Sequence, residues 1–126
     1  MTKKDFPTVH FYDQDFVDLY DQTWAWIQDF MQKGTPENGL QKQYFNYPDN
    51  KTINQFESIM STFFLVYSNR NFPATPQLDN FYEKQEPSGA IRSDYSLVDG
   101  KPVFHKDNPE GVNPPLFSWA EYNLYH

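Results

Sequence analysis

The hydrophobic positions at the start of the chain repeat with a helical period. Within 13–33, one stripe recurs at spacings of three and four residues: Phe16, Leu19, Tyr20, Thr23, Trp24, Ile27, Phe30 and Met31. Asp13 or Asp15 can cap the start of a helix, and Gly34 suits the position just after its end. The pattern predicts an amphipathic helix over 13–33, followed by a loop rich in Pro, Asn and Gly that carries several aromatic residues.

Residues 52–68 predict a second helix. Thr52, with Gln55 three residues later, has the spacing of a capping box, which satisfies backbone N–H groups at a helix start. The apolar face of this segment is broad, which is typical of a helix buried between other elements. Glu57 stands one residue after Phe56, at the edge of that face. It is either an ordinary boundary charge or a carboxylate that faces a polar cavity.

Two further helices are expected in the second half of the chain. The segment 75–86 opens with Thr75 and with Pro76, a residue favoured at the first helical position. The segment 114–126 follows Asn113 as a potential cap. No Gly, Pro or basic residue marks an end to this last helix, which predicts that the domain continues beyond the sequence.

The region between these helices, 87–114, has little helical pattern. The Asp99–Gly100 pair between short apolar runs is compatible with one small β-hairpin within 96–104. The whole chain, 1–126, therefore predicts a single all-α domain of antiparallel helical hairpins with long loops. A loop of this length in a compact domain is usually functional.

Composition excludes several classes of function. The net charge is −7 and no cluster of Lys or Arg is present, so a nucleic-acid partner is not expected. The absence of cysteine excludes disulfides and a thiol nucleophile. The N-terminus is polar, which predicts no signal peptide, and no apolar run is long enough to span a bilayer, so no membrane partner is expected. The cellular location stays open.

Candidate chemistry lies in the carboxylates and aromatic residues. His10, His105 and His126 lie far apart in the sequence, so neither a metal site nor a cofactor is predicted. The 12 Phe, 9 Tyr and 3 Trp form 19% of the chain. They are core residues or the walls of a partly wet ligand site, such as one for sugar rings, and composition leaves both interpretations open.

Asp94 is the most prominent of the 17 acidic residues, because it lies in the long loop two positions after Arg92. In an extended segment these two side chains point to the same side. They either form an ion pair, which would make Asp94 a structural carboxylate, or Asp94 faces a cavity that Arg92 also serves. Glu57 and Glu121 are the other candidates.

Three motifs then occur in order, "INQFESIMSTFF", "FYEKQEPSGAIRSDYS" and "NPPLFSWAEYNLYH". In order and spacing they resemble the catalytic domain of the six-hairpin glycosidases over 13–126. The nearest similarity is to family 63 glycoside hydrolases and the mannosylglycerate-hydrolase-like domain. The resemblance implies the N-terminal part, about a third, of an (α/α)6 toroid. It also implies inverting hydrolysis of an α-glucoside or α-mannoside.

By the same resemblance, Asp94 is the candidate general acid. Glu57, at a position where the family usually has a substrate-binding Asp, would bind substrate together with Phe56, Arg92 and Trp119. The catalytic base would lie beyond residue 126, so the 126-residue chain alone is expected to be inactive. Its partners would be a carbohydrate and either the remainder of the barrel or a second copy, through exposed apolar helix faces. The alternative is a non-catalytic helical module that binds carbohydrate or protein.

Overall fold

The computed structural model describes residues 6–125 of the chain. Its elements are, in order, α1 (Gln14–Asp29), β1 (Met31–Gln32), β2 (Tyr44–Phe45), β3 (Thr52–Asn54), α2 (Gln55–Leu65), α3 (Pro76–Tyr82), β4 (Asp94–Ser96), a 3₁₀ helix (Pro109–Gly111) and α4 (Phe117–Tyr125). No helix in this part is long and apolar enough to cross a membrane. The predictions for the first five residues and for His126 lie outside the described residues.

The prediction of an all-α fold is wrong, because the chain forms two small antiparallel sheets besides its helices. Strand β1 pairs with β2, and β3 pairs with β4, with Ile53 opposite Tyr95. Both side chains are buried, whereas Thr52 and Asn54 on either side of Ile53 are only half-buried, which is the alternation of a strand. The fold is therefore mixed α/β, and the interpretation as part of an (α/α)6 toroid is corrected.

Helix α1 ends at Asp29 rather than at residue 33, because the chain turns there into strand β1. Gly34 consequently lies in the following loop and does not cap the helix. Its N–H donates to the carbonyl of Gln41 (2.8 Å). A Cβ at Gly34 would overlap the backbone carbonyl of Leu40. Glycine is thus required for the close approach of two loop segments.

Helix α2 begins at Gln55 rather than at Thr52, because the residues before it pair with β4 as strand β3. The capping box predicted for Thr52 and Gln55 is not formed. Asn54 caps the helix instead, and its Oδ1 accepts from the backbone N–H of Glu57 (3.1 Å). Strand β3 therefore leads directly into the first turn of α2.

The two C-terminal helices are shorter than predicted. Helix α3 is limited to Pro76–Tyr82, with the proline at its start as expected, while Thr75 has helical backbone angles and makes no side-chain cap. Helix α4 begins at Phe117, after Pro114 and Pro115, rather than at Pro114 as predicted. A residue directly before a proline disfavours helical geometry, which keeps Asn113 and Pro114 out of the helix.

The turn predicted at Asp99–Gly100 is present. Gly100 has φ +70°, a left-handed conformation that side chains other than glycine rarely adopt. The N–H of Ser96 donates across the turn to the carbonyl of Lys101 (2.9 Å), and Tyr95 forms an isolated bridge with Pro102. The strand before this turn pairs mainly with β3, however, which the sequence pattern did not indicate.

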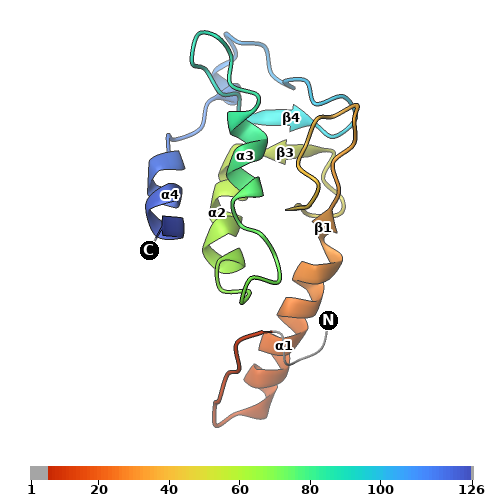
Figure 1. The fold of residues 1–126 in the computed structure, drawn as a ribbon, viewed down its shortest axis with the longest axis vertical. Helices are drawn as coiled ribbons and strands as arrows, with labels where there is room; N and C mark the ends of the chain where they lie inside the picture. Colours follow the sequence, from red (N-terminus) through yellow and green to blue (C-terminus); the bar gives the residue numbers. More distant parts are fainter. Residues whose placement is uncertain (1–5, 126) are drawn as a thin grey trace.

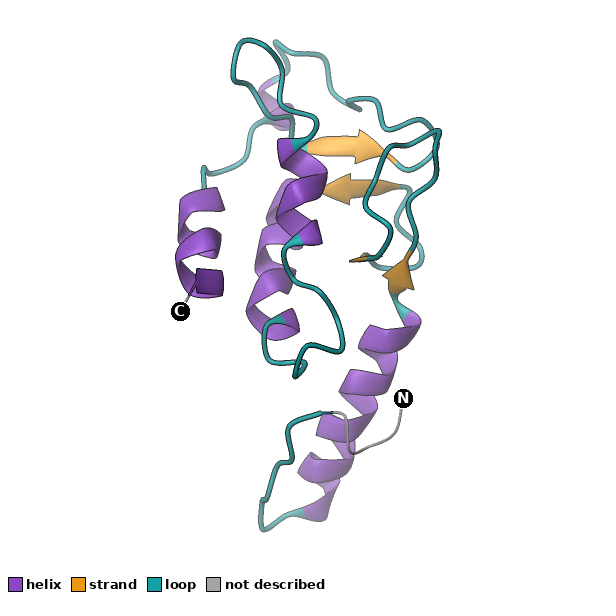
Figure 2. Ribbon diagram, in the orientation of Figure 1, coloured by secondary structure: helices purple, strands orange, loops and turns teal. Residues whose placement is uncertain are grey.

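Figures 1 and 2 show α2 and α3 side by side, with α4 on one flank and the β3–β4 sheet at one end, while α1 extends away past the other end. Three buried clusters hold these parts together. They consist of Trp24, Ile27, Phe45, Leu65 and Phe72; of Leu40, Tyr44, Ile53, Phe81 and Tyr95; and of Ile59, Leu78 and Ala120. The third cluster lies where α2, α3 and α4 meet.

Buried amide side chains fix the loop between β1 and β2. Asn38 is 4% exposed, and its Oδ1 accepts from the backbone N–H groups of Thr35 (2.9 Å) and Leu40 (3.0 Å). Its Nδ2 donates to the carbonyl of Leu97 (2.9 Å). Asn80 of α3 accepts from the N–H of Gln41 (2.7 Å). The loop is therefore part of the packed structure, although its composition resembles that of an ordinary surface loop.

Candidate functional site

Asp94 lies on strand β4, directly opposite Asn54 of β3. Residues paired in this way place their side chains on the same face of an antiparallel sheet. The Oδ1 atom of Asp94 accepts from Nδ2 of Asn54 (3.1 Å) and, at 3.5 Å, from the hydroxyl of Thr52. Within residues 6–125, its Oδ2 atom makes no hydrogen bond. One oxygen of the carboxyl group is therefore held by hydrogen bonds, and the other is available to a ligand.

Glu57 lies in the first turn of α2, beside the same asparagine. The Asn54 side chain accepts from the Glu57 N–H with its oxygen and donates to Asp94 with its nitrogen. The Glu57 carboxylate is exposed and accepts from Nδ2 of Asn50 (3.0 Å). Asn54 thus links two acidic residues that are far apart in the sequence, Asp94 through its carboxyl group and Glu57 through its backbone N–H.

Arg92 does not pair with Asp94. Its Nε and Nη2 atoms both donate to Oε1 of Glu86, at 3.0 and 2.8 Å, and this ion pair is largely buried on the arginine side. Its backbone N–H donates to the hydroxyl of Tyr95 (2.9 Å). The arginine side chain borders a separate open hollow of about 510 Å³, together with Lys101. A direct contact between Arg92 and substrate remains a prediction.

The two aromatic candidates lie in different places. Phe56 is adjacent to Glu57 at the start of α2, and 45% of its surface is exposed. Trp119 of α4 packs on Phe63, with ring centroids 4.4 Å apart. Phe63 is two turns, roughly 10 Å, further along α2 than Phe56. The structure therefore places Phe56 next to Glu57 in the first turn of α2, and Trp119 against the C-terminal part of the same helix.

Asn54 and Thr52 are the residues of this site that the sequence did not single out. A signal for Asn54 was present, because an Asn followed three residues later by Glu57 also fits a helix start. The apparent capping box at Thr52 competed with that signal. Only the pairing of β3 with β4 decides between the two, since it makes Thr52 a strand residue.

A second hollow, of about 350 Å³, lies between α1 and α2 and is almost wholly aromatic and aliphatic. Its walls include Trp24, Trp26, Phe45, Tyr47 and Phe64. Tyr47 is the exposed member of the loop aromatics, and Trp26 is 48% exposed. The groove carries no carboxylate, so it offers apolar contact and no acid–base chemistry.

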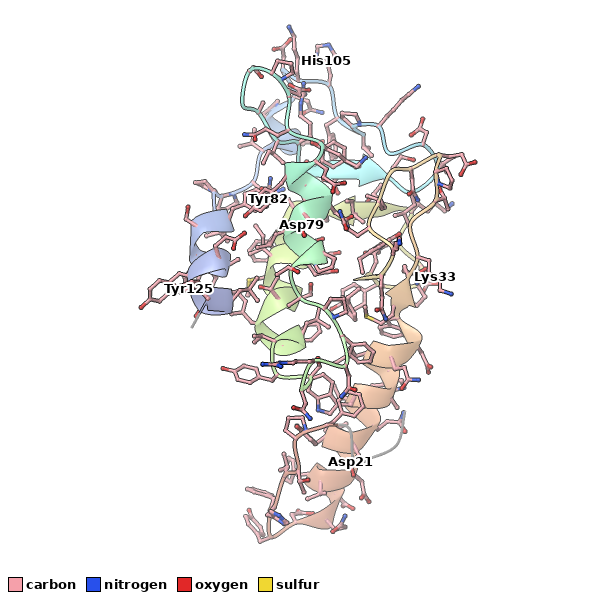
Figure 3. The ribbon with its side chains drawn as sticks, in the orientation of Figure 1. Asp21, Lys33, Asp79, Tyr82, His105 and Tyr125 are labelled. Atoms are coloured by element: carbon pink, nitrogen blue, oxygen red, sulfur yellow. The ribbon has the colours of Figure 1, made fainter. Side chains whose placement is uncertain are left out.

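A polar contact joins α3 to α4. The hydroxyl of Tyr82 donates to Oε1 of Glu121 (2.8 Å), which ties the third acidic candidate to α3 rather than to Asp94. Burial and then the hydrogen bond to Glu121 raise the pKa of Tyr82 well above its usual value. Asp79 lies one turn before Tyr82 on the same helix (Figure 3). Burial, followed by the charges of Glu83 and Glu121, raises the pKa of Asp79.

Replacing Asp79 by Asn is expected to stabilise the protein at neutral pH. The pKa of Asp79 is higher in the folded state than its ordinary value of 3.8. Asp79 therefore favours folding at pH values below 3.8, and this contribution is lost as the pH rises through the folded-state pKa. The neutral amide removes the cost of a charged group, so the thermal midpoint at pH 7 should rise by about 2–3 °C. Thermal melts at pH 7 and at pH values near 3.5 measure the difference.

The exposed residue Asp49 supplies the control, because its replacement by Asn removes the same charge from the surface. Its midpoint should change little at either pH. The gain in Asp79→Asn should shrink at the acidic pH, where the native side chain is already protonated. An equal gain at both pH values would contradict the role assigned to the Asp79 charge.

Among the described residues, no three His, Asp or Glu side chains gather in a group able to hold a metal ion. The N-terminal end of α2 instead combines two carboxylates with the amides of Asn50 and Asn54. Such groups accept hydrogen bonds from hydroxyl groups and donate hydrogen bonds to them, and a carboxyl group can also transfer a proton.

Comparisons with known proteins give one informative match. The chain is 45% identical, over 130 residues, to an uncharacterised protein of Borreliella burgdorferi. The alignment covers the whole of this chain and 27% of that protein, so the chain spans about a quarter of the relative's length. No protein-family model matches the sequence. No solved structure matches it either.

Proposed function

We propose that this chain supplies part of the substrate site of a glycoside hydrolase, with Asp94 as the general acid. The observation that carries the proposal is the single Asn54 side chain that contacts both Asp94 and the Glu57 backbone. The two residues that the glycosidase resemblance singles out therefore share one hydrogen-bond partner, which supports the proposal. The exposed ring of Phe56, which is adjacent to Glu57 in the chain, suits the apolar face of a sugar.

The hydrogen bonds assign roles to the two oxygens of Asp94. Oδ1 accepts a hydrogen bond from the Asn54 amide, whereas Oδ2 has no partner among the described residues. The proposed role therefore assigns proton donation to Oδ2. In inverting hydrolysis this proton passes to the leaving oxygen while a second carboxylate, about 6.5–9.5 Å away, activates water on the opposite face.

Glu57 is assigned to substrate binding rather than to the base. Its carboxylate is exposed and already accepts from Asn50, an arrangement suited to holding a substrate hydroxyl. The base then comes from another part of a longer polypeptide. The Borreliella protein, of which this chain matches 27%, has ample length for such a part.

The test compares hydrolysis by the 126-residue chain with hydrolysis by the whole Borreliella protein. The substrates are methyl and aryl α-glucosides and α-mannosides, and proton NMR follows the anomer that is released. The long protein is expected to turn over one series with inversion, and the 126-residue chain is expected to bind without turnover. Robust turnover by the short chain would refute the assignment. Binding without turnover by the long protein would support the non-catalytic module.

A further inference from the structure

A third hollow, of about 280 Å³, lies beside the start of α2. It lies between the first residue of α2, the loop that follows α3 and the segment that leads into α4. Gln55, Ile91 and Asn113 are among the residues that line it. At about 30 Å³ per water molecule, its volume corresponds to roughly nine waters. That space suits one monosaccharide ring rather than an extended chain.

Gln55 carries an unused amide into this hollow. The residue is 5% exposed, and its backbone N–H donates to the carbonyl of Ser93 (2.7 Å). Its side-chain amide makes no hydrogen bond with any described residue, although buried amides are almost always paired. Neither amide atom is sealed from solvent, since Ser93 Oγ is the one fully buried side-chain polar atom without a partner in this part of the chain. Two donors and an acceptor are therefore available to a ligand.

The walls around this amide are apolar and firmly packed. Phe117 contacts the rings of Tyr82 and Phe81, with centroids 5.2 and 6.1 Å away, so its position is fixed. Pro115 and Val112 add further apolar surface, and the half-buried Asn113 contributes a second amide. No charged side chain lines the hollow. These features suit a neutral ring with one C–H face and hydroxyl edges, and disfavour a phosphate or carboxylate ligand.

The hollow and the carboxylate site share their backbone. Gln55 directly follows Asn54, and Ser93 directly precedes Asp94, so the hydrogen bond from Gln55 N–H to the Ser93 carbonyl joins the two sites. Successive residues of a strand point to opposite faces, so Ser93 points away from the face that carries Asp94. The hollow is therefore a site of its own.

We infer that this hollow is a binding subsite for one neutral hexopyranoside ring. The amides of Gln55 and Asn113 bind its hydroxyl groups, and Phe117 with Pro115 covers its C–H face. The choice of ligand class rests on the proposed function, but the subsite itself is separate from catalysis, because it contains no acid or base.

The inference can be tested on the 126-residue chain by NMR. Methyl α-D-glucopyranoside and methyl α-D-mannopyranoside are titrated while the side-chain amide signal of Gln55 is followed. One of the two is expected to cause a saturable shift at millimolar concentration. Gln55→Leu should weaken that binding about tenfold, the loss expected for two hydrogen bonds of ordinary strength. Gln43→Leu, at an exposed position, is the matched control and should bind normally.

Thermal melts of the same variants separate a binding role from a structural one. Gln55→Leu removes no hydrogen bond within the described protein, so its midpoint should not fall. A large fall would show that the amide supports the fold and would overturn the inference. Asn113→Ala is the second variant, and it too should weaken binding while leaving the midpoint unchanged. Absence of a saturable shift, or unchanged affinity in both variants, would also overturn it.

The outcomes distinguish this inference from the proposed function. Glycoside binding that depends on Gln55, without turnover by the Borreliella protein, would support the subsite and refute the hydrolase. Turnover by that protein, with affinity that does not depend on Gln55 or Asn113, would support the hydrolase and refute the subsite.

Discussion

Replacing Asp94 by Asn, at the aligned position of the Borreliella protein, is expected to lower hydrolysis of a methyl glycoside by about 100- to 10,000-fold. The amide has nearly the shape of the carboxyl group, and its oxygen can still accept from the Asn54 side chain. It has no acidic proton for the leaving oxygen, so the rate of bond cleavage falls while sugar binding is kept. Steady-state turnover and NMR titration measure the two effects separately.

The leaving group provides a diagnostic for this role. A 2,4-dinitrophenyl glycoside expels a stable anion that needs no proton, so the same variant should lose less than about tenfold on that substrate. Asp99→Asn, in the exposed turn after β4, is the control and should retain its activity. Equal losses on both substrates would rule out a general acid. So would an alignment that places a residue other than Asp or Glu at this position.

Gln77→Leu is expected to cause the largest loss of stability. Gln77 is 1% exposed, and its Oε1 accepts from the N–H of Phe45 (2.7 Å). Its Nε2 donates to the Phe45 carbonyl (3.0 Å) and to the hydroxyl of Ser61 (2.6 Å). The amide thus pairs with β2 as a neighbouring strand would. Leucine leaves the buried N–H and carbonyl of Phe45 unpaired, at about 1–3 kcal/mol each, so a loss of about 3–5 kcal/mol in the free energy of unfolding is expected. The hydroxyl of Ser61 keeps its bond to the carbonyl of Ser58 (2.7 Å).

Urea unfolding of Gln77→Leu and of the native chain measures this difference. A domain of this size has a stability of about 5–15 kcal/mol, so the variant should unfold at a much lower denaturant concentration. Gln43→Leu makes the same replacement on the surface and should change the stability by less than about 0.5 kcal/mol. A loss below about 1 kcal/mol in Gln77→Leu would show that the buried pairing is not required.

The candidate site was predicted only in part. Asp94 and Glu57 could be chosen from their residue types and motifs, and Phe56 from its position beside Glu57. The partner of Arg92 could not be chosen, because Glu86 and Asp94 are both within reach of an arginine in a loop, and only the path of that loop selects Glu86. The Gln55 amide was equally hidden, since the sequence assigned it to a capping box.

The sequence by itself determined the approximate positions of α1, α2 and α3, the turn at Asp99–Gly100 and the absence of thiol chemistry. A helical period repeats over several turns, and a turn or a proline acts on its neighbours, so these signals are local. The tertiary structure alone decided that Thr52–Asn54 is a strand and that α2 starts after it. Three residues are too few to display a strand period. Their partners, such as Asp94 for Asn54, lie 40 positions away, so the strand exists only once the chain has folded.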